Sequence, residues 1–561
     1  MGLGFALEAP WRKNWPSGVP FNIKYPEIAV YDLLENSAKK YPNRTALIFY
    51  GRRLSYTEVE LLARRAASAL VDTGVGKGDR VALILPNIPQ FIIAYYAALM
   101  TGATVVPINP LCDSAEIGRQ VIQCKARTLI SLDVFLDKVA EAGLDPSDRV
   151  VIATKAETYL PFPAKILRRG SRRKSSTSHM NLERMLREHE PATDLATVDA
   201  REDIAVIQYT GGTTGSPKGA MLTHYSLVAN VIQTYHWLRG WGHARKPQFH
   251  GHPVVLGAVP FFHIYGMTVA MNEAIHSAST LVLLVKPEAG SMIQSISRHD
   301  VTHFPATPTM FRTILSHPSF DKLRSSQLGY CVSGGDPISS KVVDEFSDSI
   351  HADFFVGYGL TEASPVTHCT VAGYPVPEGC VGIPFPDTQA KIMDIQTGER
   401  EMPPGTLGEL IVKGPQIMKG YIQDAQNDLA LRNGWLYTGD VGYMDETGLF
   451  YIVDRKQDRI LSKGHTVWPR GIEEVLMNHP SVEAAAVVGI DDPQRCAVEV
   501  RAYVVPKPGH RLQPDELSRF CSKALENYQI PEVFEIVDNL PTTPLGKISR
   551  SSARSWKKGQ I

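Results

Sequence analysis

The 561-residue sequence predicts an α/β fold, with a large N-terminal domain of layered α/β subdomains plus a β-rich subdomain, and a small α+β C-terminal domain. Three observations predict it. Helical periodicity alternates with short apolar runs over about 29–153 and again over about 203–380. Short strands bounded by Gly and Pro then dominate over about 380–453. The remainder, 458–561, is long enough for one small domain.

The first segment contains amphipathic helical patterns over 31–41 and 57–74. Short apolar runs, typical of buried strands, accompany them at 45–50, 79–86, 103–109, 128–132 and 149–154. This alternation is typical of a layered sheet.

The alternation fails over 159–183. The central part of this stretch has no acid but six basic residues, Lys165, Arg168, Arg169, Arg172, Arg173 and Lys174. We predict a solvated surface linker. The alternative is contact of 165–174 with anionic lipid headgroups, where each Lys or Arg near a membrane adds about 1 kcal/mol.

Apolar runs resume after the linker, at 203–210, 254–260, 279–285, 301–307, 328–335 and 352–359. The β-rich part has runs at 389–395, 408–414, 434–444 and 448–454. In the last part, helices are expected at 469–478 and 515–525, and strands at 484–490 and 499–506. We therefore predict a domain of residues 1–456 that contains the linker and the β-rich subdomain, and a second domain of residues 458–561.

Composition excludes several classes of protein. The 58 basic residues balance 58 acidic ones, so no electrostatic field favours nucleic acid, and a small-molecule ligand is expected. The seven cysteines form no C-x-x-C pair, which argues against a zinc site or a disulfide framework and favours the cytoplasm. We expect no signal peptide, lipid anchor or transmembrane span, because the N-terminus lacks an apolar core and no apolar run reaches about 20 residues.

The densest chemical signal is the loop QYTGGTTGSPKGA over 208–220, directly after an apolar run. Its glycines let backbone N–H groups approach an anion, its threonines add hydroxyl donors, and its lysine adds a positive charge. These residues are Thr210, Gly211, Gly212, Thr213, Thr214, Gly215, Lys218 and Gly219. The loop does not match G-x-x-x-x-G-K-[ST], so it is a phosphate-binding loop of another kind.

The loop resembles the Y-T-[SG]-G-T-T-G-x-P-K-G motif of the adenylate-forming superfamily, which includes acyl-CoA synthetases, firefly-luciferase-like enzymes and adenylation domains. Further motifs follow in the family's order: YGLTE at 358–362, YTGD at 437–440, DR at 454–455, Gly464 with VWP at 467–469, and PTTPLGK at 541–547. The resemblance spans about 28–550. The segments YTGGTTG, GAMLTH and YGLTEASPVTH are most similar to bacterial and archaeal long-chain fatty acid–CoA ligases.

The resemblance implies formation of an acyl adenylate from a carboxylic acid and ATP with Mg²⁺, followed by transfer of the acyl group to coenzyme A. By resemblance, the loop holds the phosphates, with Thr214 among the catalytic residues, and Glu362 holds Mg²⁺, an oxygen-seeking ion. Lys547 bridges the substrate carboxylate and the α-phosphate; such a preorganised donor supplies about 3–4 kcal/mol.

Other roles are also implied by the resemblance. Tyr358 stacks on adenine and Thr361 contacts the α-phosphate. Asp440 and Arg455 bind the ribose hydroxyls, for which a carboxylate and a forked donor are suitable. The remaining assignments are the adenine-facing Gly334 and Gly335, and Gly464 beside the CoA arm.

The family rotates its mobile C-terminal domain about the residue that here is Gln457, where relatives have Lys or Asp. A polar uncharged residue absorbs a backbone rotation equally well, so we expect a modest effect. The C-terminal domain also has Gly471 where relatives have Glu, and Cys496-Ala497 where they have Gly-Glu. These changes would weaken thioester formation and leave adenylation intact.

The acid is expected to lack an ammonium group. Amino-acid-activating relatives have an Asp in the segment matching 259–266, whereas this chain has Phe262-His263 there, and an unpaired buried ammonium is costly. His263 is a wall of the carboxylate site or an ordinary core histidine. Asp336, near the acyl pocket, must face solvent, pair with a cation or read a polar feature of the acid.

We therefore predict a medium- to long-chain fatty acid–CoA ligase whose partners are fatty acid, ATP and CoA, without nucleic acid. The alternatives are a ligase for aryl or other acids, a fatty acyl-AMP ligase that loads a carrier protein, and a non-catalytic acyl-nucleotide binder. The expected location is the cytoplasm, with attachment to the inner face of the membrane as the alternative. The sequence leaves a homodimer open.

Overall fold

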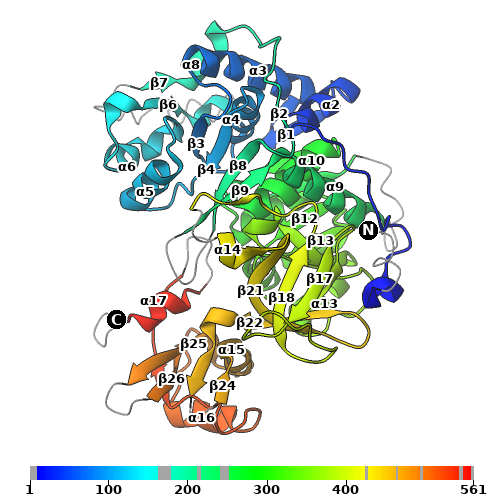
Figure 1. The fold of residues 1–561 in the computed structure, drawn as a ribbon, viewed down its shortest axis with the longest axis vertical. Helices are drawn as coiled ribbons and strands as arrows, with labels where there is room; N and C mark the ends of the chain where they lie inside the picture. The colour runs from blue at the N-terminus through cyan, green and yellow to red at the C-terminus, as the bar shows by residue number, and fades with distance from the viewer. Residues whose placement is uncertain are drawn as a thin grey trace.

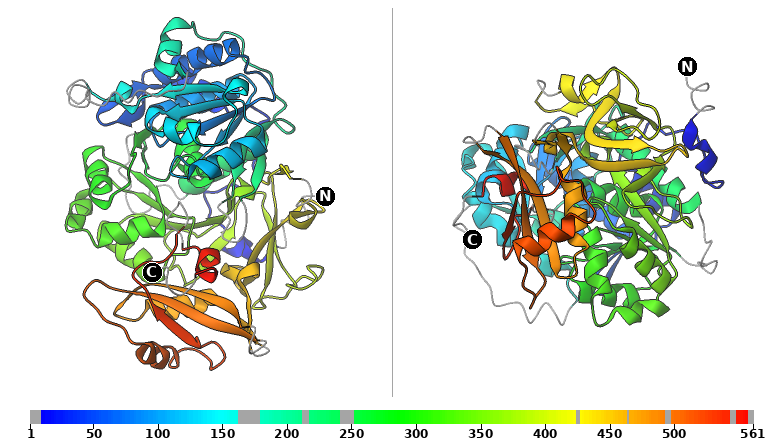
Figure 2. Two further views of the ribbon diagram at one scale, coloured as in Figure 1. Left: turned by 90° about the vertical axis from the view of Figure 1, so that its left-hand side faces the viewer. Right: turned by 90° about the horizontal axis from the view of Figure 1, so that it is seen from below.

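The structure is a computed structural model that describes residues 9–161, 179–210, 217–240, 252–423, 427–462, 465–492, 497–542 and 548–556. It confirms the α/β prediction. The two main sheets have eight and fourteen strands. Figure 1 shows the smaller of these sheets with its helices at one end, the larger sheet in the middle, and a small domain at the other end. Figure 2 shows that the small domain lies beneath the larger part.

The eight-stranded sheet has the order β19-β9-β8-β4-β3-β5-β6-β7, with a parallel core and β9 and β19 antiparallel at one edge. Its strands are β3 (Arg80–Ile84), β4 (Thr104–Pro107), β5 (Thr128–Leu132), β6 (Val150–Thr154), β7 (Met180–Asn181), β8 (Ile204–Tyr209), β9 (Gly219–Thr223) and β19 (Gly420–Tyr421). The end of the predicted linker is thus ordered: Met180 pairs with Ile152, and Asn181 caps the next helix. The basic run 165–174 lies outside the described residues.

Alternating residues of β3 point to opposite faces of this sheet. One face packs with α3 (Tyr56–Asp72), α4 (Pro89–Met100) and α8 (Leu182–Glu188); the other packs with α5 (Ser114–Cys124) and α6 (Leu136–Ala140). Every residue of α4 is buried, because Tyr96 and Phe91 also reach the middle of the molecule and contact Asn272 and Phe261. This explains the long apolar run there.

The larger sheet has a parallel core, β14-β13-β12-β10-β11-β1, with β2 antiparallel at one edge. Beyond β14, the antiparallel strands β15, β16, β22, β21, β18 and β17 extend it, and β20 pairs with β21. The predicted β-rich segment therefore continues the central sheet. The bounds are β1 (Thr45–Phe49), β2 (Arg52–Ser55), β10 (Val254–Gly257), β11 (Thr280–Leu283), β12 (His303–Ala306), β13 (Tyr330–Ser333), β14 (Asp353–Gly359), β15 (Val366–Cys369), β16 (Cys380–Pro384), β17 (Gln389–Met393), β18 (Gly408–Lys413), β20 (Leu431–Arg432), β21 (Trp435–Met444) and β22 (Phe450–Arg455).

Helices cover both faces of the parallel core. One set shares the main core with the eight-stranded sheet: α2 (Asp32–Lys40), α9 (His224–Gly240), the π-helical η5 (Gly266–Asn272) and α10 (Glu273–His276). The other set forms a separate core: α11 (Ala289–Arg298), α12 (Pro308–Leu315) and α13 (Ser340–Ile350). Short elements complete this part: η1 (Pro10–Asn14), η2 (Asp133–Phe135), η3 (Pro146–Asp148), η4 (Ala156–Tyr159), η6 (Phe320–Ser325), η7 (Thr361–Ala363) and α14 (Asn427–Ala430).

From Asp458, the last residue of η9 (Lys456–Asp458), the chain forms the small domain. It contains the hairpin β23 (Ile460–Ser462) and β24 (His465–Val467), and the sheet of β25 (Val482–Asp492), β26 (Ala497–Pro506) and β27 (Val533–Ile536). Its helices are α15 (Pro469–Met477), α16 (Pro514–Cys521) and α17 (Arg550–Arg554). Two cores on opposite faces of the sheet hold it together.

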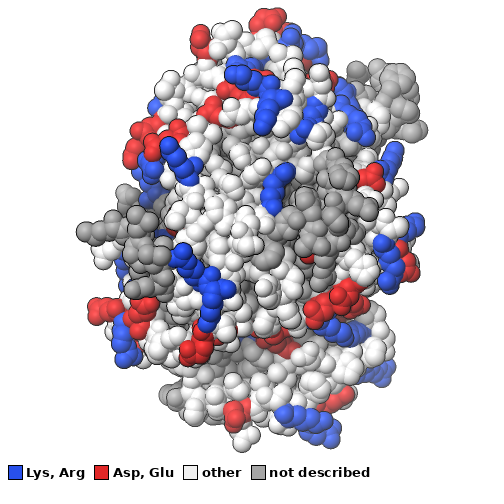
Figure 3. Space-filling model, turned by 90° about the vertical axis from the view of Figure 1, so that its right-hand side faces the viewer, with Lys and Arg blue, Asp and Glu red and all other residues white. Residues whose placement is uncertain are grey.

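The described surface and helices show two further features. On the face drawn in Figure 3, acidic and basic side chains are interspersed, as the zero formal net charge leads one to expect. Within the described ranges, no helix has both the length and the apolar character needed to cross a lipid bilayer.

Candidate active site

A cavity of about 2850 Å³ lies between the large N-terminal part and the small domain, and residues of both line it. It gathers the predicted site residues that fall within the described ranges: Thr210, Lys218, His263, Gly334, Gly335, Asp336, Tyr358, Thr361, Glu362, Asp440, Arg455 and Gln457. Seven other predicted site residues lie outside these ranges: Gly211, Gly212, Thr213, Thr214, Gly215, Gly464 and Lys547. Lys218 and Arg550, which are 332 positions apart in the sequence, therefore border one space.

Asp440 lies at the centre of a hydrogen-bonded group in this cavity. Asp440 on β21 pairs directly with Arg455 on β22, and the Arg455 Nε lies 2.7 Å from the Asp440 Oδ1. The Tyr358 hydroxyl, at the end of β14, donates to Asp440 Oδ2 at 2.5 Å. The Thr438 hydroxyl accepts from the Asp440 backbone N–H at 3.0 Å, which holds the β21 backbone in place at Asp440. Burial, and then the Asp440 charge, raise the pKa of Tyr358, so the phenol stays protonated and donates.

The Asp440 group is held partly out of water. The Asp440 side chain is 7% exposed, whereas the Arg455 side chain is 41% exposed, so the guanidinium faces the cavity. The Asp440 charge raises the pKa of Arg455, which stays cationic. A buried carboxylate beside an exposed guanidinium and an aromatic ring can bind hydroxyl groups and an adjacent flat heterocycle.

Glu362 lies in a second polar corner of the cavity, on η7. The Tyr421 hydroxyl donates to Glu362 Oε1 at 2.6 Å, and the Met418 N–H donates to the Glu362 carbonyl at 2.8 Å. Tyr421 is on β19, which pairs with β9 directly after Lys218; the Lys218 Nζ lies 5.2 Å from the centre of the Tyr421 ring. The carboxylate and the ammonium therefore flank one aromatic ring.

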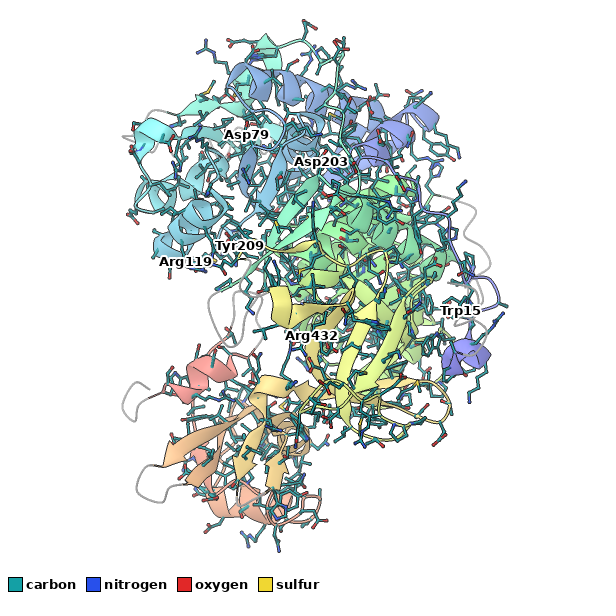
Figure 4. All side chains as sticks on the ribbon, in the orientation of Figure 1. Trp15, Asp79, Arg119, Asp203, Tyr209 and Arg432 are labelled. Carbon is teal, nitrogen blue, oxygen red and sulfur yellow. The ribbon has the colours of Figure 1, made fainter. Side chains whose placement is uncertain are left out.

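The described ends of the Gly- and Thr-rich loop are tied together. The Thr210 N–H donates to the Lys218 carbonyl at 2.8 Å, and the Lys218 N–H donates to the Thr210 hydroxyl at 3.2 Å. The loop begins at the end of β8, where the Tyr209 hydroxyl donates to the Gln120 carbonyl at 3.0 Å. Figure 4 shows Tyr209, the last residue of β8, at the end of the upper sheet that faces the small domain.

His263 lines the cavity, and Gln208 lies on β8, just before the loop. The Gln208 Nε2 donates to the Phe262 carbonyl at 2.9 Å, while its buried Oε1 has no hydrogen-bond partner among the described residues. The Tyr265 N–H donates to His263 Nδ1 at 3.2 Å, which orients the ring. Glycine is required at position 266, the first residue of η5, because a Cβ there would lie 2.2 Å from the Pro260 carbonyl oxygen.

Asp336 borders the cavity close to a cation. The Asp336 charge acts on Arg312 of α12, opposing the effect of burial, which lowers the pKa of that guanidinium. Both residues line the cavity. The role of Asp336 stays a prediction. A Cβ added at Gly334 would lie 3.3 Å from the Tyr265 Cζ, and Gly335 has a φ of +91° that favours glycine.

Charged residues surround the predicted hinge. Lys456 Nζ lies 2.7 Å from Glu409 Oε2, and Arg550 Nη1 lies 3.0 Å from Asp458 Oδ2. The same Arg550 nitrogen lies 2.6 Å from Asp454 Oδ1. Sequence reasoning missed the roles of these residues, as well as those of Tyr421 and Thr438. The only signal in the sequence was that some of them, such as Thr438 and Lys456, lie within or next to a motif.

The residues of the cavity fit a nucleotide with Mg²⁺. Mg²⁺ is usually held by one or two carboxylates together with phosphate oxygens and waters, and Glu362 supplies one such carboxylate. Among the residues that the structure describes, no group of three or more His, Cys, Asp or Glu side chains is arranged to hold a metal ion. The donor set therefore suits an ion that arrives with a nucleotide better than one held by protein alone.

Comparisons with known proteins agree with this geometry. Residues 34–422 match the family model "AMP-binding enzyme", and residues 471–547 match "AMP-binding enzyme C-terminal domain". The chain is 37% identical over 553 residues to a long-chain-fatty-acid–CoA ligase of Bacillus subtilis, covering 97% of both chains. It is 32% identical over 569 residues to a long-chain-fatty-acid–CoA ligase of Escherichia coli, covering 99% of both. The ATP-bound structure of MatB from Rhodopseudomonas palustris superposes with a TM-score of 0.81 at 25% identity, covering 94% of this chain and 98% of that one.

Proposed function

The chain belongs to the AMP-binding enzyme family, and we propose that it is an ATP-dependent ligase that converts a medium- to long-chain fatty acid to acyl-AMP and then to acyl-CoA. AMP and pyrophosphate are the other products. The observation that carries this proposal is the Asp440 group, which faces the same cavity as Lys218 and Glu362. One end of the cavity suits a nucleoside and the other suits its phosphates.

In the proposed first step, the fatty acid carboxylate attacks the α-phosphate of ATP and pyrophosphate leaves. Asp440 accepts hydrogen bonds from the ribose hydroxyls, Arg455 donates to the ribose, and Tyr358 and the Gly334-Gly335 backbone border the adenine. Thr210, Lys218 and the loop between them bind the phosphates, and Thr361 binds the α-phosphate. Glu362 would hold Mg²⁺, which when bound neutralises phosphate charge.

The second step transfers the acyl group to the thiol of CoA. We propose that Lys547 bridges the carboxylate and the α-phosphate in the first step, and that rotation about Gln457 then clears it from the site. Gly464 would border the CoA arm. His263 would form part of the carboxylate wall, with Asp336 and Arg312 bordering the acyl side. The domains proposed are 1–456 and 458–561.

Product analysis by mass spectrometry tests this function. The purified protein is incubated with Mg-ATP, CoA and an equimolar mixture of fatty acids of about 6 to 20 carbons and several aryl acids. We expect acyl-CoA from one range of fatty acids. Aryl-CoA products would support the alternative of an aryl acid ligase, acyl-AMP without thioester would indicate a carrier protein as acceptor, and no product would favour a non-catalytic binder.

A further inference from the structure

Two ion pairs anchor the chain on either side of Gln457. Lys456 is held by Glu409, a 6%-exposed residue of β18 in the N-terminal part. Asp458 is held by Arg550 of the small domain, and its side chain is 3% exposed. The backbone between 456 and 458 therefore joins two separately anchored segments, which is where a rotation between the two parts would concentrate.

Arg550 also reaches back across this joint. Its guanidinium contacts Asp458 and Glu473, both in the small domain, with the Glu473 Oε2 at 2.6 Å from Nη2. The third partner is Asp454, which precedes Gln457 and belongs to β22 of the large sheet; the Nη1–Oδ1 distance is 2.6 Å. Burial acts to lower the pKa of Arg550, but the three carboxylates outweigh it and raise that pKa, so the cation persists.

Asp454 makes a second bond across the joint. Its Oδ2 accepts from the Arg470 backbone N–H at 2.8 Å, in the first turn of α15, where a carboxylate interacts favourably with the helix dipole. Arg470 Nη1 in addition donates to the Ile452 carbonyl at 3.0 Å. The Asp454 side chain is 2% exposed and the Arg550 side chain is 14% exposed, so water screens their attraction weakly.

From this geometry we propose that Asp454 is a positioning residue, a latch that holds the small domain in the observed orientation through Arg550 and the N-terminus of α15. Rotation about Gln457 would carry Arg550, Asp458 and Glu473 together and leave Asp454 behind. The bonds within the small domain would survive, whereas both bonds to Asp454 would break. The latch therefore sets how much of the population occupies the observed orientation.

The consequence for catalysis rests on the proposed function. In the observed orientation, Thr542, Ile548 and Arg550 line the cavity together with Asp440, on both sides of the segment that contains Lys547. We infer that this orientation serves adenylation. The latch then favours the first half-reaction over the second, which requires rotation.

Two isosteric variants form a matched test. Asp454→Asn and Asp458→Asn each remove one carboxylate from Arg550, but only Asp454 precedes the joint. The first half-reaction is measured as pyrophosphate exchange into ATP, and the second as thioester formation from added acyl-AMP and CoA. We expect D454N to lower the ratio of the first rate to the second by about tenfold, and D458N to change it by less than about twofold. Equal ratios in the two variants would overturn the latch.

A second readout does not depend on catalysis. Trypsin cleaves after Arg455, Lys456 and Arg459, which flank the joint, so a released latch should expose these bonds. We expect cleavage there to be several-fold faster in D454N than in D458N at equal thermal stability, and equal rates would count against the proposal. If the wild type makes neither acyl-AMP nor acyl-CoA, the proposed function fails while this comparison still decides the latch. Asp454→Glu keeps the charge, so its ratio of half-reaction rates and its cleavage rate should lie between those of the wild type and D454N. This variant replaces D454N if D454N does not fold.

Discussion

Asp440 and Arg455 face each other across β21 and β22, with the guanidinium Nε 2.7 Å from the carboxylate Oδ1. The pair is not an isolated surface salt bridge, because Tyr358 donates to the other carboxylate oxygen. One buried carboxylate thus orients a guanidinium and a phenol toward the same cavity. Its loss should affect nucleotide binding more than the loss of a surface charge.

The variant Asp440→Asn should lower kcat/KM for ATP by about 10- to 100-fold, since a hydrogen bond to a charged group contributes about 1.5–3 kcal/mol. Steady-state kinetics with varied ATP measure the effect. The control is Glu446→Gln, which removes an exposed carboxylate from the turn between the same two strands and should leave kcat/KM unchanged. A D440N enzyme with wild-type kcat/KM for ATP would contradict the ribose assignment.

Single substitutions of Glu362 and of Tyr421 should reduce adenylation to different extents. Glu362→Gln removes the proposed Mg²⁺ ligand, so we expect adenylation to fall by at least about 100-fold and to require more Mg²⁺. Tyr421→Phe keeps the carboxylate and removes only one hydrogen bond of about 1 kcal/mol, so a loss of about fivefold is expected. Pyrophosphate exchange at several Mg²⁺ concentrations tests both. Equal losses in the two variants, without a shift in Mg²⁺ dependence, would refute the metal assignment.

Lys547→Ala should abolish most adenylate formation yet spare the reaction of preformed acyl-AMP with CoA. The positive charge is needed only while negative charge develops on the α-phosphate and the carboxylate, as proposed. Both half-reactions are assayed separately on the same preparation. An equal loss of both would contradict the assigned role of Lys547.

The sequence motifs predicted site residues whose described members line one cavity, while the roles assigned to them stay predictions. Thr210, Glu362 and Asp440 are far apart in the chain, but each is in a motif, and the resemblance of these motifs to those of a known family placed the three residues in one site. The resemblance supplied the roles, and residues without a motif signature were missed. Tyr421 is one example: nothing near it in sequence indicates a partner 59 residues away.

Strand order was also beyond the sequence. The segment after residue 380 was predicted to be β-rich, and it forms strands, but its continuation of the central sheet depends on pairing of β15 with β14 and of β22 with β16. Such pairings join edges that are distant in the chain, and local patterns do not encode them. For the same reason, the bonds of Arg550 to both sides of the hinge could not be predicted.

Glu273 should make stability depend on pH. This residue of α10 is 5% exposed, and burial raises its pKa from 4.5 to about 7, although Arg239 and Ser277 act in the opposite direction. Because the folded-state pKa is raised, its contribution to stability is fully present below pH 4.5 and is lost as the pH rises through about 7. The corresponding free energy is at most about 3 kcal/mol.

The variant Glu273→Gln removes this titration. Its melting temperature should be close to that of the wild type at pH 5 and higher than that of the wild type at pH 8, as measured by calorimetry. The exposed Glu399 provides the control, because E399Q should show no such dependence. A difference between E273Q and wild type that does not change between pH 5 and pH 8 would mean that Glu273 is not buried as the structure indicates.

Two glycines should respond to alanine in opposite directions. Gly471 is in the first turn of α15, and a Cβ there would meet no atom of the described residues within 4 Å. Gly471→Ala should therefore stabilise the small domain by up to about 1 kcal/mol through helix propensity and reduced entropy of the unfolded chain. Gly266→Ala would place a Cβ 2.2 Å from the Pro260 carbonyl oxygen and should destabilise by about 2 kcal/mol or more, since the backbone must shift. Denaturant unfolding of both variants, followed by a probe in each domain, measures these changes.

Gly471 also borders the cavity, so the assay of both half-reactions shows whether the missing side chain matters for catalysis. Unchanged rates with higher stability in Gly471→Ala would make Gly471 a neutral departure from its relatives. A slower thioester step would show that the open space at this position is used.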